Sequence, residues 1–117
     1  MFPYETLDVY NKAFKANQLI YRLVKNSNIA VPFLRNQLGR ASLSIMLNIA
    51  EGSAKTGIRD RRNFFVIARG SVFESAALIS FLFAEKEISE QVRNELYSAF
   101  EEISRMLFSL IRNLETK

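Results

Sequence analysis

The sequence contains neither cysteine nor histidine, and these absences narrow the chemistry open to it. Without cysteine the chain has no disulfide framework and no thiolate metal site. Without histidine it lacks the commonest general base, the commonest zinc ligand and the Ser-His and Cys-His pairs of nucleophilic enzymes. An enzyme would have to work with carboxylates, lysine or tyrosine. We therefore expect no enzyme, no metal site and no cofactor.

Proline and glycine are also scarce, with two prolines and four glycines in 117 residues. Both prolines precede segments that we predict to be helical, and no segment alternates with the period of a strand. The uninterrupted apolar runs are too short to span a bilayer. The N-terminal MFPYETLDVY lacks the basic start and long apolar run of a signal peptide. We expect a single domain over residues 1–117, in the cytoplasm and without a membrane partner.

The charged residues are distributed unevenly along the chain, although the net charge is only +4. Residues 1–62 hold ten Lys and Arg against four Asp and Glu, whereas residues 63–117 hold six against eight. A basic half and a mildly acidic half predict an oriented electrostatic field rather than a uniformly basic surface.

Four segments show helical periodicity, over about 6–26, 32–53, 60–84 and 89–114. Pro32 suits a first helical turn, Asp60 suits the positive end of a helix dipole, and Ser89 is a favoured N-cap. Short connections make sequential helices antiparallel neighbours. The sequence therefore predicts an all-α protein, an antiparallel up-down-up-down four-helix bundle.

The last predicted helix carries more apolar residues than one narrow core requires. Its two overlapping seams are Val92, Leu96, Ala99, Ile103, Met106 and Leu110, and Leu96, Phe100, Ile103, Leu107, Leu110 and Leu114. A bundle of this size needs about three apolar positions in seven. The extra width favours coverage by a second copy of the chain, because large exposed apolar patches are rare on monomers. The alternative is a broad core helix in a monomer.

Asn48 and Glu51 stand among apolar residues in GRASLSIMLNIAEGSAKTG, and Gly52 follows them. Polar groups on an apolar face need hydrogen-bond partners, so we expect them to bond across to another helix or to cap the next one. Gly52 would let the chain leave the helix, and Gly70 and Ser71 would let helices approach closely. Asn48 and Glu51 fit a packing-register device better than a ligand or metal site, because one carboxylate alone is a poor metal or acid/base site.

These residues belong to a longer pattern. It comprises Arg40-Ala41-Ser42, Ser44-Ile45, Asn48-Ile49-Ala50-Glu51-Gly52-Ser53, Phe64, Ile67-Ala68, Gly70-Ser71 and Glu74. With it the chain resembles, over nearly its whole length, the small bacterial four-helix-bundle proteins named after the 23S rRNA intervening sequences in which some are encoded. The early LDVYNKAFKANQLIYRL resembles the first helix of that family. Where relatives commonly continue with Gly-Arg or a glycine pair, this chain has Ala54-Lys55, so the contacts of such an arginine would fall to Lys55.

The resemblance implies an antiparallel four-helix bundle and a ring-like homopentamer with a central channel. It also points to the related accessory variability proteins of diversity-generating retroelements, which are basic and bind nucleic acid and a reverse transcriptase. The resemblance implies no enzymatic activity, and it leaves the biological role open.

A basic stretch leads into the third predicted helix. The candidate phosphate-binding residues are Lys55, Arg59, Arg61, Arg62, Arg69 and Arg40. Arginine suits phosphate through its planar fork of donors, and such contacts read no sequence and weaken with salt. The alternative is a solvated helix face with local ion pairs to Glu51, Asp60 and Glu74.

We therefore expect a non-enzymatic, oligomeric protein that binds RNA or DNA through this patch. The alternative is a scaffold that docks a protein partner, with charge serving only solubility. An enzyme that uses Glu51 and Glu74 is the least favoured interpretation, because carboxylate metal sites in bundles recruit more Glu and His than this chain supplies.

Overall fold

The computed structural model describes residues 1–26 and 29–116, and within them the chain forms helices and no strand. A short 3-10 helix, η1 (Pro3–Thr6), precedes four α-helices: α1 (Asp8–Lys25), α2 (Pro32–Ala54), α3 (Ile58–Ala84) and α4 (Glu90–Glu115). The four predicted helical segments are confirmed, with bounds that differ by at most a few residues.

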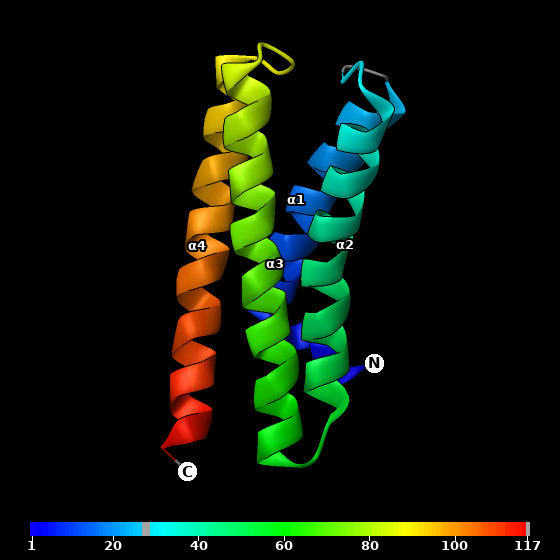
Figure 1. Cartoon of the computed structure of the whole chain (residues 1–117). Coiled ribbons are helices and arrows are strands. Elements are labelled where there is room, and N and C mark those ends of the chain that lie inside the picture. The colour runs from blue at the N-terminus through cyan, green and yellow to red at the C-terminus, as the bar shows by residue number, and fades with distance from the viewer. Residues whose placement is uncertain (27–28, 117) are drawn as a thin grey trace.

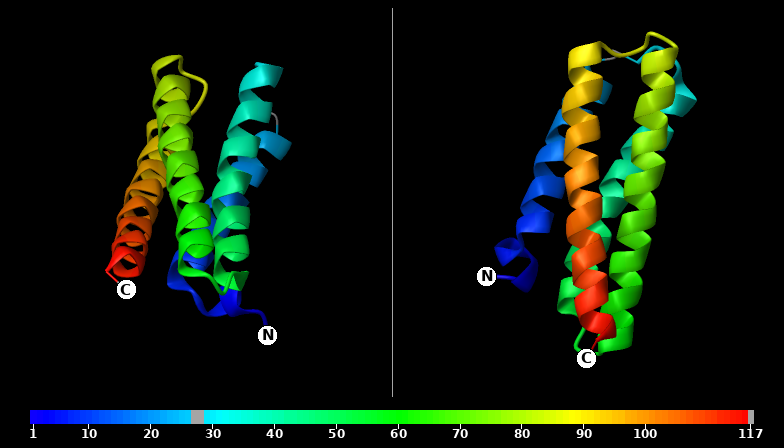
Figure 2. Two further views of the ribbon diagram at one scale, coloured as in Figure 1. Left: turned by 60° about the horizontal axis from the view of Figure 1, so that its bottom comes forward. Right: turned by 90° about the vertical axis from the view of Figure 1, so that its left-hand side faces the viewer.

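The four helices pack side by side in a closed circuit. α1 and α3 each contact both α2 and α4, and the molecule measures 45 × 25 × 21 Å along its principal axes. The connections α1–α2 and α3–α4 lie at one end, and the tight α2–α3 turn lies at the other end, toward which both chain termini also lie (Figures 1 and 2). Each helix therefore has two neighbours and an outward side.

A single apolar core runs between the helices. Its most deeply buried large side chains include Val9 and Ile20 from α1, Leu38, Ile45 and Ile49 from α2, Val72, Ile79 and Leu82 from α3, and Leu96, Phe100 and Leu107 from α4. Within each helix these residues recur at spacings of three or four, or their sums, which places them on one stripe. Burial of such stripes supplies the main driving force for the fold.

Local signals set the helix ends as the sequence indicates. The Ser89 hydroxyl oxygen accepts a hydrogen bond of 3.2 Å from the Val92 amide, so the predicted N-cap of α4 is confirmed. Pro32 opens α2, and Asp60 lies in the first turn of α3. Lys86, the second residue after α3, has a positive φ of 63°.

The broad apolar surface of α4 is largely covered by the chain itself. Leu96, Phe100, Ile103, Leu107 and Leu114 are buried. The remaining seam residues are half-buried and pack against the same core: Val92, Ala99, Met106 and Leu110. Exposed large apolar side chains remain on α4 at Tyr97 and Phe108, and more of them lie on α2 and α3: Phe33, Leu43, Leu47, Val66, Ile67, Phe73 and Phe81.

α3 is apolar enough and, at 27 residues, long enough to cross a membrane by length and composition. Its most apolar 18-residue window has a mean hydropathy of 1.6 and is only 33% buried in the protein. Counting uninterrupted runs in the sequence misses this helix, because isolated polar residues break the runs. A core helix of a soluble protein passes the same test, so α3 is weak evidence for a membrane span. Most of this apolar window is not buried against the other helices.

Candidate nucleic-acid interface

Arg61, from the predicted basic patch, closes the α2–α3 turn. Its Nε and Nη2 atoms donate hydrogen bonds to the carbonyl oxygens of Gly52 (3.3 Å) and Ser53 (3.0 Å) at the end of α2. The last carbonyls of a helix have no partner within the helix and carry its negative dipole end, so a guanidinium satisfies both needs. Two donor nitrogens of Arg61 are therefore occupied within the chain.

Arg62 and Arg69 join α3 to α4. Arg62 donates through Nε and Nη2 to Glu115 Oε1, at 2.9 and 2.7 Å. Arg69 donates to the carbonyl oxygen of Ser104 at 3.3 Å, and its guanidinium lies 5.0 and 5.1 Å from the ring centroids of Phe73 and Phe108. A guanidinium over the face of an aromatic ring is attracted to that ring, so Arg69 links Phe73 of α3 to Phe108 of α4. Both arginines therefore make contacts that hold α3 against α4.

Lys55 and Arg59 remain the most available cations at the turn. Both are exposed. Lys55 Nζ lies 5.2 Å from the Phe64 ring centroid, and Arg59 makes no hydrogen bond or ion pair with the described residues. Arg40 belongs to a different surface: it is fifteen residues before Lys55, which is about 22 Å along a helix. The structure thus divides the six candidate residues among three places.

A polar contact joins α2 to α3 beside the central motif. Asn48 Nδ2 donates to the carbonyl oxygen and to Oγ of Ser44, at 2.9 and 3.0 Å. Ser44 Oγ lies 2.8 Å from Ser71 Oγ across the helix pair. Both hydrogen bonds of Asn48 stay within α2, so the expected bond from Asn48 across to another helix or to the start of α3 is wrong, and Ser44 and Ser71 make the contact between the two helices instead. Glu51 is exposed and makes no hydrogen bond or ion pair with the described residues.

The two glycines of the motif differ from our expectation. Gly52 is buried inside α2, which continues to Ala54, so Gly52 is not where the chain leaves the helix. A Cβ there would lie 2.8 Å from the Phe65 ring, so glycine is needed because α3 passes close by. Gly70 is exposed, and a Cβ there would meet nothing within 4 Å. The idea that Gly70 lets two helices of one chain approach is wrong, because Gly70 faces away from them.

Glu74 and Glu51 do not form a pair. Glu74 accepts a 2.5 Å hydrogen bond from Gln37 of α2, and Glu51 lies fourteen residues beyond Gln37, about 21 Å along that helix. Among residues 1–26 and 29–116 no group of three or more Asp and Glu side chains is placed to hold a metal ion. The arrangement offers no site for carboxylate-based chemistry between these two residues.

Sequence reasoning missed a polar contact between α1 and α2. Asn17 Nδ2 donates to the carbonyl oxygens of Ala13 (3.0 Å) and Ser42 (2.9 Å), and the Ser42 hydroxyl donates back to Asn17 Oδ1 at 3.0 Å. Ser42 is fully buried. A signal was present, since Asn17 lies beside the alanine-rich stripe of α1, but only the structure identifies its partner.

An aromatic cluster covers the N-terminal end of α1, away from these contacts. The rings of Tyr4 and Tyr10 lie 4.6 Å apart, and those of Tyr10 and Phe14 lie 6.2 Å apart. Burial raises the pKa of Tyr10, and the neighbouring Tyr4 and Glu5 raise it further. This cluster contains no basic group and adds nothing to the candidate interface.

The chain is thus a small all-α protein of four packed helices, with a polar contact along the α2–α3 pair and exposed cations at the α2–α3 turn. The family model for 23S rRNA-intervening sequence proteins matches residues 5–109. The chain belongs to this family, and the resemblance seen in the sequence is confirmed.

A solved structure shows the same fold. It is the 1.70 Å crystal structure of a protein of unknown function from the S23 ribosomal protein family of Bacteroides thetaiotaomicron VPI-5482. The TM-score is 0.81 at 23% sequence identity, and the match covers 88% of this chain and 97% of that chain. No curated protein matches the sequence. The relatives therefore establish the fold and the family without supplying an activity.

Proposed function

We propose that this chain is a non-enzymatic, self-assembling bundle of up-down-up-down topology that binds the phosphate backbone of RNA or DNA. The observation that carries the proposal is the exposure of Lys55 and Arg59 at the α2–α3 turn. Residues 52–62 contain four Lys and Arg and one acidic residue, Asp60. Of the four cations, Arg61 and Arg62 are held by carbonyl and carboxylate oxygens, and the other two are left to meet an external anion.

Phosphate contacts of this kind position a protein on nucleic acid without reading its sequence. Two free cations on one chain make a weak site, because each phosphate contact is exposed and screened by salt. A repeated array of the same turn would raise the apparent affinity through multivalency. The proposal therefore couples binding to self-assembly.

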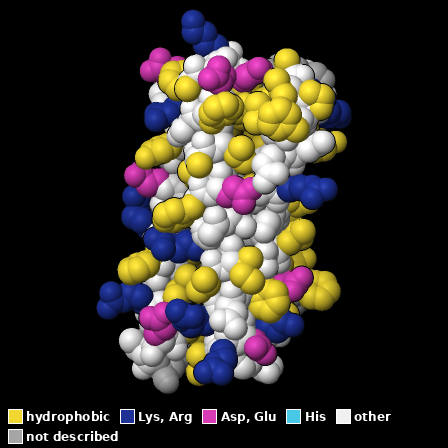
Figure 3. Space-filling model, in the orientation of Figure 1, with side chains coloured by type: hydrophobic (Ala, Val, Ile, Leu, Met, Phe, Trp, Pro, Cys, Tyr) yellow, Lys and Arg dark blue, Asp and Glu magenta, His cyan; other side chains and the backbone are white. Residues whose placement is uncertain are grey.

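The outward faces of α2 and α3 support self-assembly. Leu47 and Ile67 are 50% and 52% exposed, and Phe73 and Phe81 are 58% and 51% exposed. Apolar side chains are spread over the face shown in Figure 3, between charged ones. Gly70 lies on this side of α3 with open space beside it, where an adjacent chain could approach closely. The family resemblance implies a ring of five copies, which would repeat the α2–α3 turn around its circumference.

The test is fluorescence anisotropy of a labelled hairpin RNA and a labelled duplex DNA across a range of salt concentrations. The wild-type protein should bind, with log affinity falling linearly as log salt rises, by about 0.9 per phosphate contacted on duplex DNA. Lys55→Glu/Arg59→Glu should abolish most of the binding. The matched control is Lys15→Glu/Lys86→Glu, which makes the same change of charge at two other exposed lysines.

Equal weakening by the two double variants would show that overall charge, not the turn, is responsible. Absence of binding at low salt would remove the nucleic-acid function altogether. It would leave the second candidate function, a protein-docking scaffold, and a pull-down from nuclease-treated lysate would then show a retained partner. An apolar groove between α1 and α2 independently favours this protein-docking function.

A further inference from the structure

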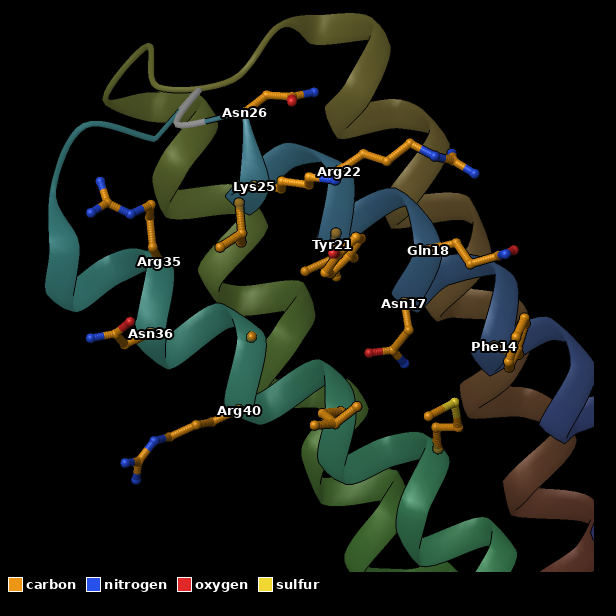
Figure 4. Close-up of a pocket in the computed structure, with 15 residues that line it drawn as sticks. Phe14, Asn17, Gln18, Tyr21, Arg22, Lys25, Asn26, Arg35, Asn36 and Arg40 are labelled. Atoms are coloured by element: carbon orange, nitrogen blue, oxygen red, sulfur yellow. The ribbon is translucent and has the colours of Figure 1, made fainter.

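A groove of about 1050 Å³ runs between α1 and α2, at the end of the molecule opposite the α2–α3 turn (Figure 4). Apolar side chains from both helices line it: Phe14, Ile20, Tyr21 and Val24 from α1, and Leu43 and Met46 from α2. Phe14 and Tyr21 are 44% and 63% exposed. The described part of the chain thus leaves an apolar surface open between two helices.

Four cations are among the residues that line this groove, and none of its described lining residues is acidic. Arg22 and Lys25 extend from α1, and Arg35 and Arg40 extend from α2 (Figure 4). Arg35 donates to the carbonyl oxygen of Ile29 at 2.7 Å, which fixes it to the α1–α2 connection. Arg22 and Arg40 make no hydrogen bond or ion pair with the described residues. The rim therefore carries positive charge that the chain does not neutralise.

Gly39 lies in the middle of α2 and lines the same groove. A Cβ there would meet nothing within 4 Å, so no contact inside the chain requires a glycine. Glycine in a helix interior is unfavourable by about 0.5–1 kcal/mol relative to alanine. The residue leaves room on the wall of the groove for a backbone that approaches from outside the chain.

We propose that this groove docks an acidic amphipathic helix of another protein. Its α2 wall extends from Arg35 to Met46, about 16 Å, which matches three turns of a docked helix. Helices bind such grooves through apolar side chains at positions i, i+3, i+4 and i+7. Carboxylates that flank this apolar stripe would meet Arg22 and Arg40 at the two edges of the groove, where their side chains project outward from α1 and α2 (Figure 4).

The apolar floor disfavours nucleic acid as the occupant, because a phosphate backbone has no group to fill it. A second copy of the chain also fits poorly. The acidic first half of α4 has Tyr97 as its one large exposed apolar side chain in the described structure. The outward face of α3 is apolar, but beyond its first turn it carries Glu74 alone as an acidic residue. Apolar and acidic side chains do meet where α3 ends, at Phe81, Phe83, Glu85 and Glu87, but the two carboxylates lie in the connection after the helix, so this end does not supply three turns of an acidic helix.

The probe is a labelled synthetic helical peptide of about four turns, with leucines at i, i+3, i+4 and i+7 and glutamates at the flanking positions. One control peptide has the same composition with leucines scattered around the helix, and a second has glutamine in place of glutamate. The native protein should bind the acidic amphipathic peptide at least about tenfold more tightly than either control, a difference of about 1.4 kcal/mol.

Two variants locate the site. Arg22→Glu/Arg40→Glu should weaken binding by at least about tenfold, whereas Lys15→Glu/Lys86→Glu should change it little. Gly39→Trp should abolish peptide binding because the indole would fill the open groove, and circular dichroism should show an unchanged helical content. Lys55→Glu/Arg59→Glu should leave peptide binding intact, which separates this site from the proposed nucleic-acid interface.

Four outcomes would overturn the proposal. The first is that the scattered-leucine peptide binds as well as the amphipathic one, and the second is that Arg22→Glu/Arg40→Glu binds the amphipathic peptide as tightly as the wild type does. The third is that Gly39→Trp changes the sedimentation mass, which would assign the groove to a second copy of the chain. The fourth is that no peptide binds and Arg22→Glu/Arg40→Glu loses binding of duplex RNA, which would assign the groove to nucleic acid.

Discussion

Arg61 Nη2 donates a 3.0 Å hydrogen bond to the carbonyl oxygen of Ser53, so the first turn of α3 caps the last turn of α2. The same guanidinium reaches the carbonyl oxygen of Gly52 through Nε. This residue, predicted as a phosphate ligand, is in the structure a structural cation.

The corresponding prediction compares Arg61 with Arg59. Arg61→Gln should lower the free energy of unfolding by about 1–2 kcal/mol, because hydrogen bonds from a charged donor are lost and carbonyls at a helix end are left without it. Arg59→Gln should change the stability by less than about 0.5 kcal/mol, since that side chain is exposed and has no described partner. Urea unfolding followed by circular dichroism measures both. Equal losses in the two variants would contradict the capping role.

Gly52 and Gly39 should respond to alanine with opposite signs. Gly52→Ala should destabilise the protein by about 1–3 kcal/mol, because its Cβ would lie 2.8 Å from the ring of buried Phe65. Gly39→Ala should stabilise it by about 0.5–1 kcal/mol, because the new methyl group meets open space in a helix interior. Thermal unfolding of the two variants gives the comparison. A Gly52→Ala protein at least as stable as the wild type would show that α3 has room to shift.

Asn17 and Ser42 should behave as a coupled pair. Asn17→Ala should cost about 1–3 kcal/mol because it leaves the buried Ser42 hydroxyl without its acceptor. Adding Ser42→Ala to that variant removes the unsatisfied hydroxyl, so the double variant should be less destabilised than the sum of the two single changes, by at least about 0.5 kcal/mol. Asn17→Ala combined with Ser98→Ala, an exposed serine on α4, serves as the additive control. Additivity in both combinations would mean that the hydrogen bonds between Asn17 and Ser42 contribute nothing measurable.

The helices were predictable from the sequence because their signals are local. Apolar spacing, Pro32 at the start of α2 and Ser89 before α4 each depend on residues within one or two turns. The family pattern pointed independently to the same four-helix bundle. These signals cover nearly all of the described fold.

The roles of the basic residues were not predictable in the same way. A fork of donors suits a phosphate and a helix C-terminus equally well, so the chemistry of Arg61 does not say which it meets. Its two carbonyl partners lie eight and nine residues away, across the α2–α3 turn. Glycine is ambiguous for a similar reason: Gly52 reads as a helix end until Phe65 of the next helix is placed beside it. Partners from different helices decide these roles, and the sequence does not reveal those partners.

Self-association should depend on the outward faces of α2 and α3. Leu47 and Ile67 are about half exposed and lie on these neighbouring helices. Leu47→Glu/Ile67→Glu should leave the fold intact, because surface substitutions cost little, but should dissociate the assembly, because an interface would have to bury two unpaired charges. Sedimentation equilibrium of wild type and variant measures the change in mass.

Tyr21→Glu/Tyr97→Glu is the matched control, since it adds the same two charges at exposed aromatic residues on α1 and α4. This control should keep the wild-type mass if α2 and α3 form the interface. A control that dissociates while Leu47→Glu/Ile67→Glu stays assembled would move the interface to α1 and α4. A wild-type protein that sediments as a single chain would contradict self-assembly itself, and the exposed apolar residues of α3 would then have to be covered by a different partner, since such surface rarely stays open on a monomer.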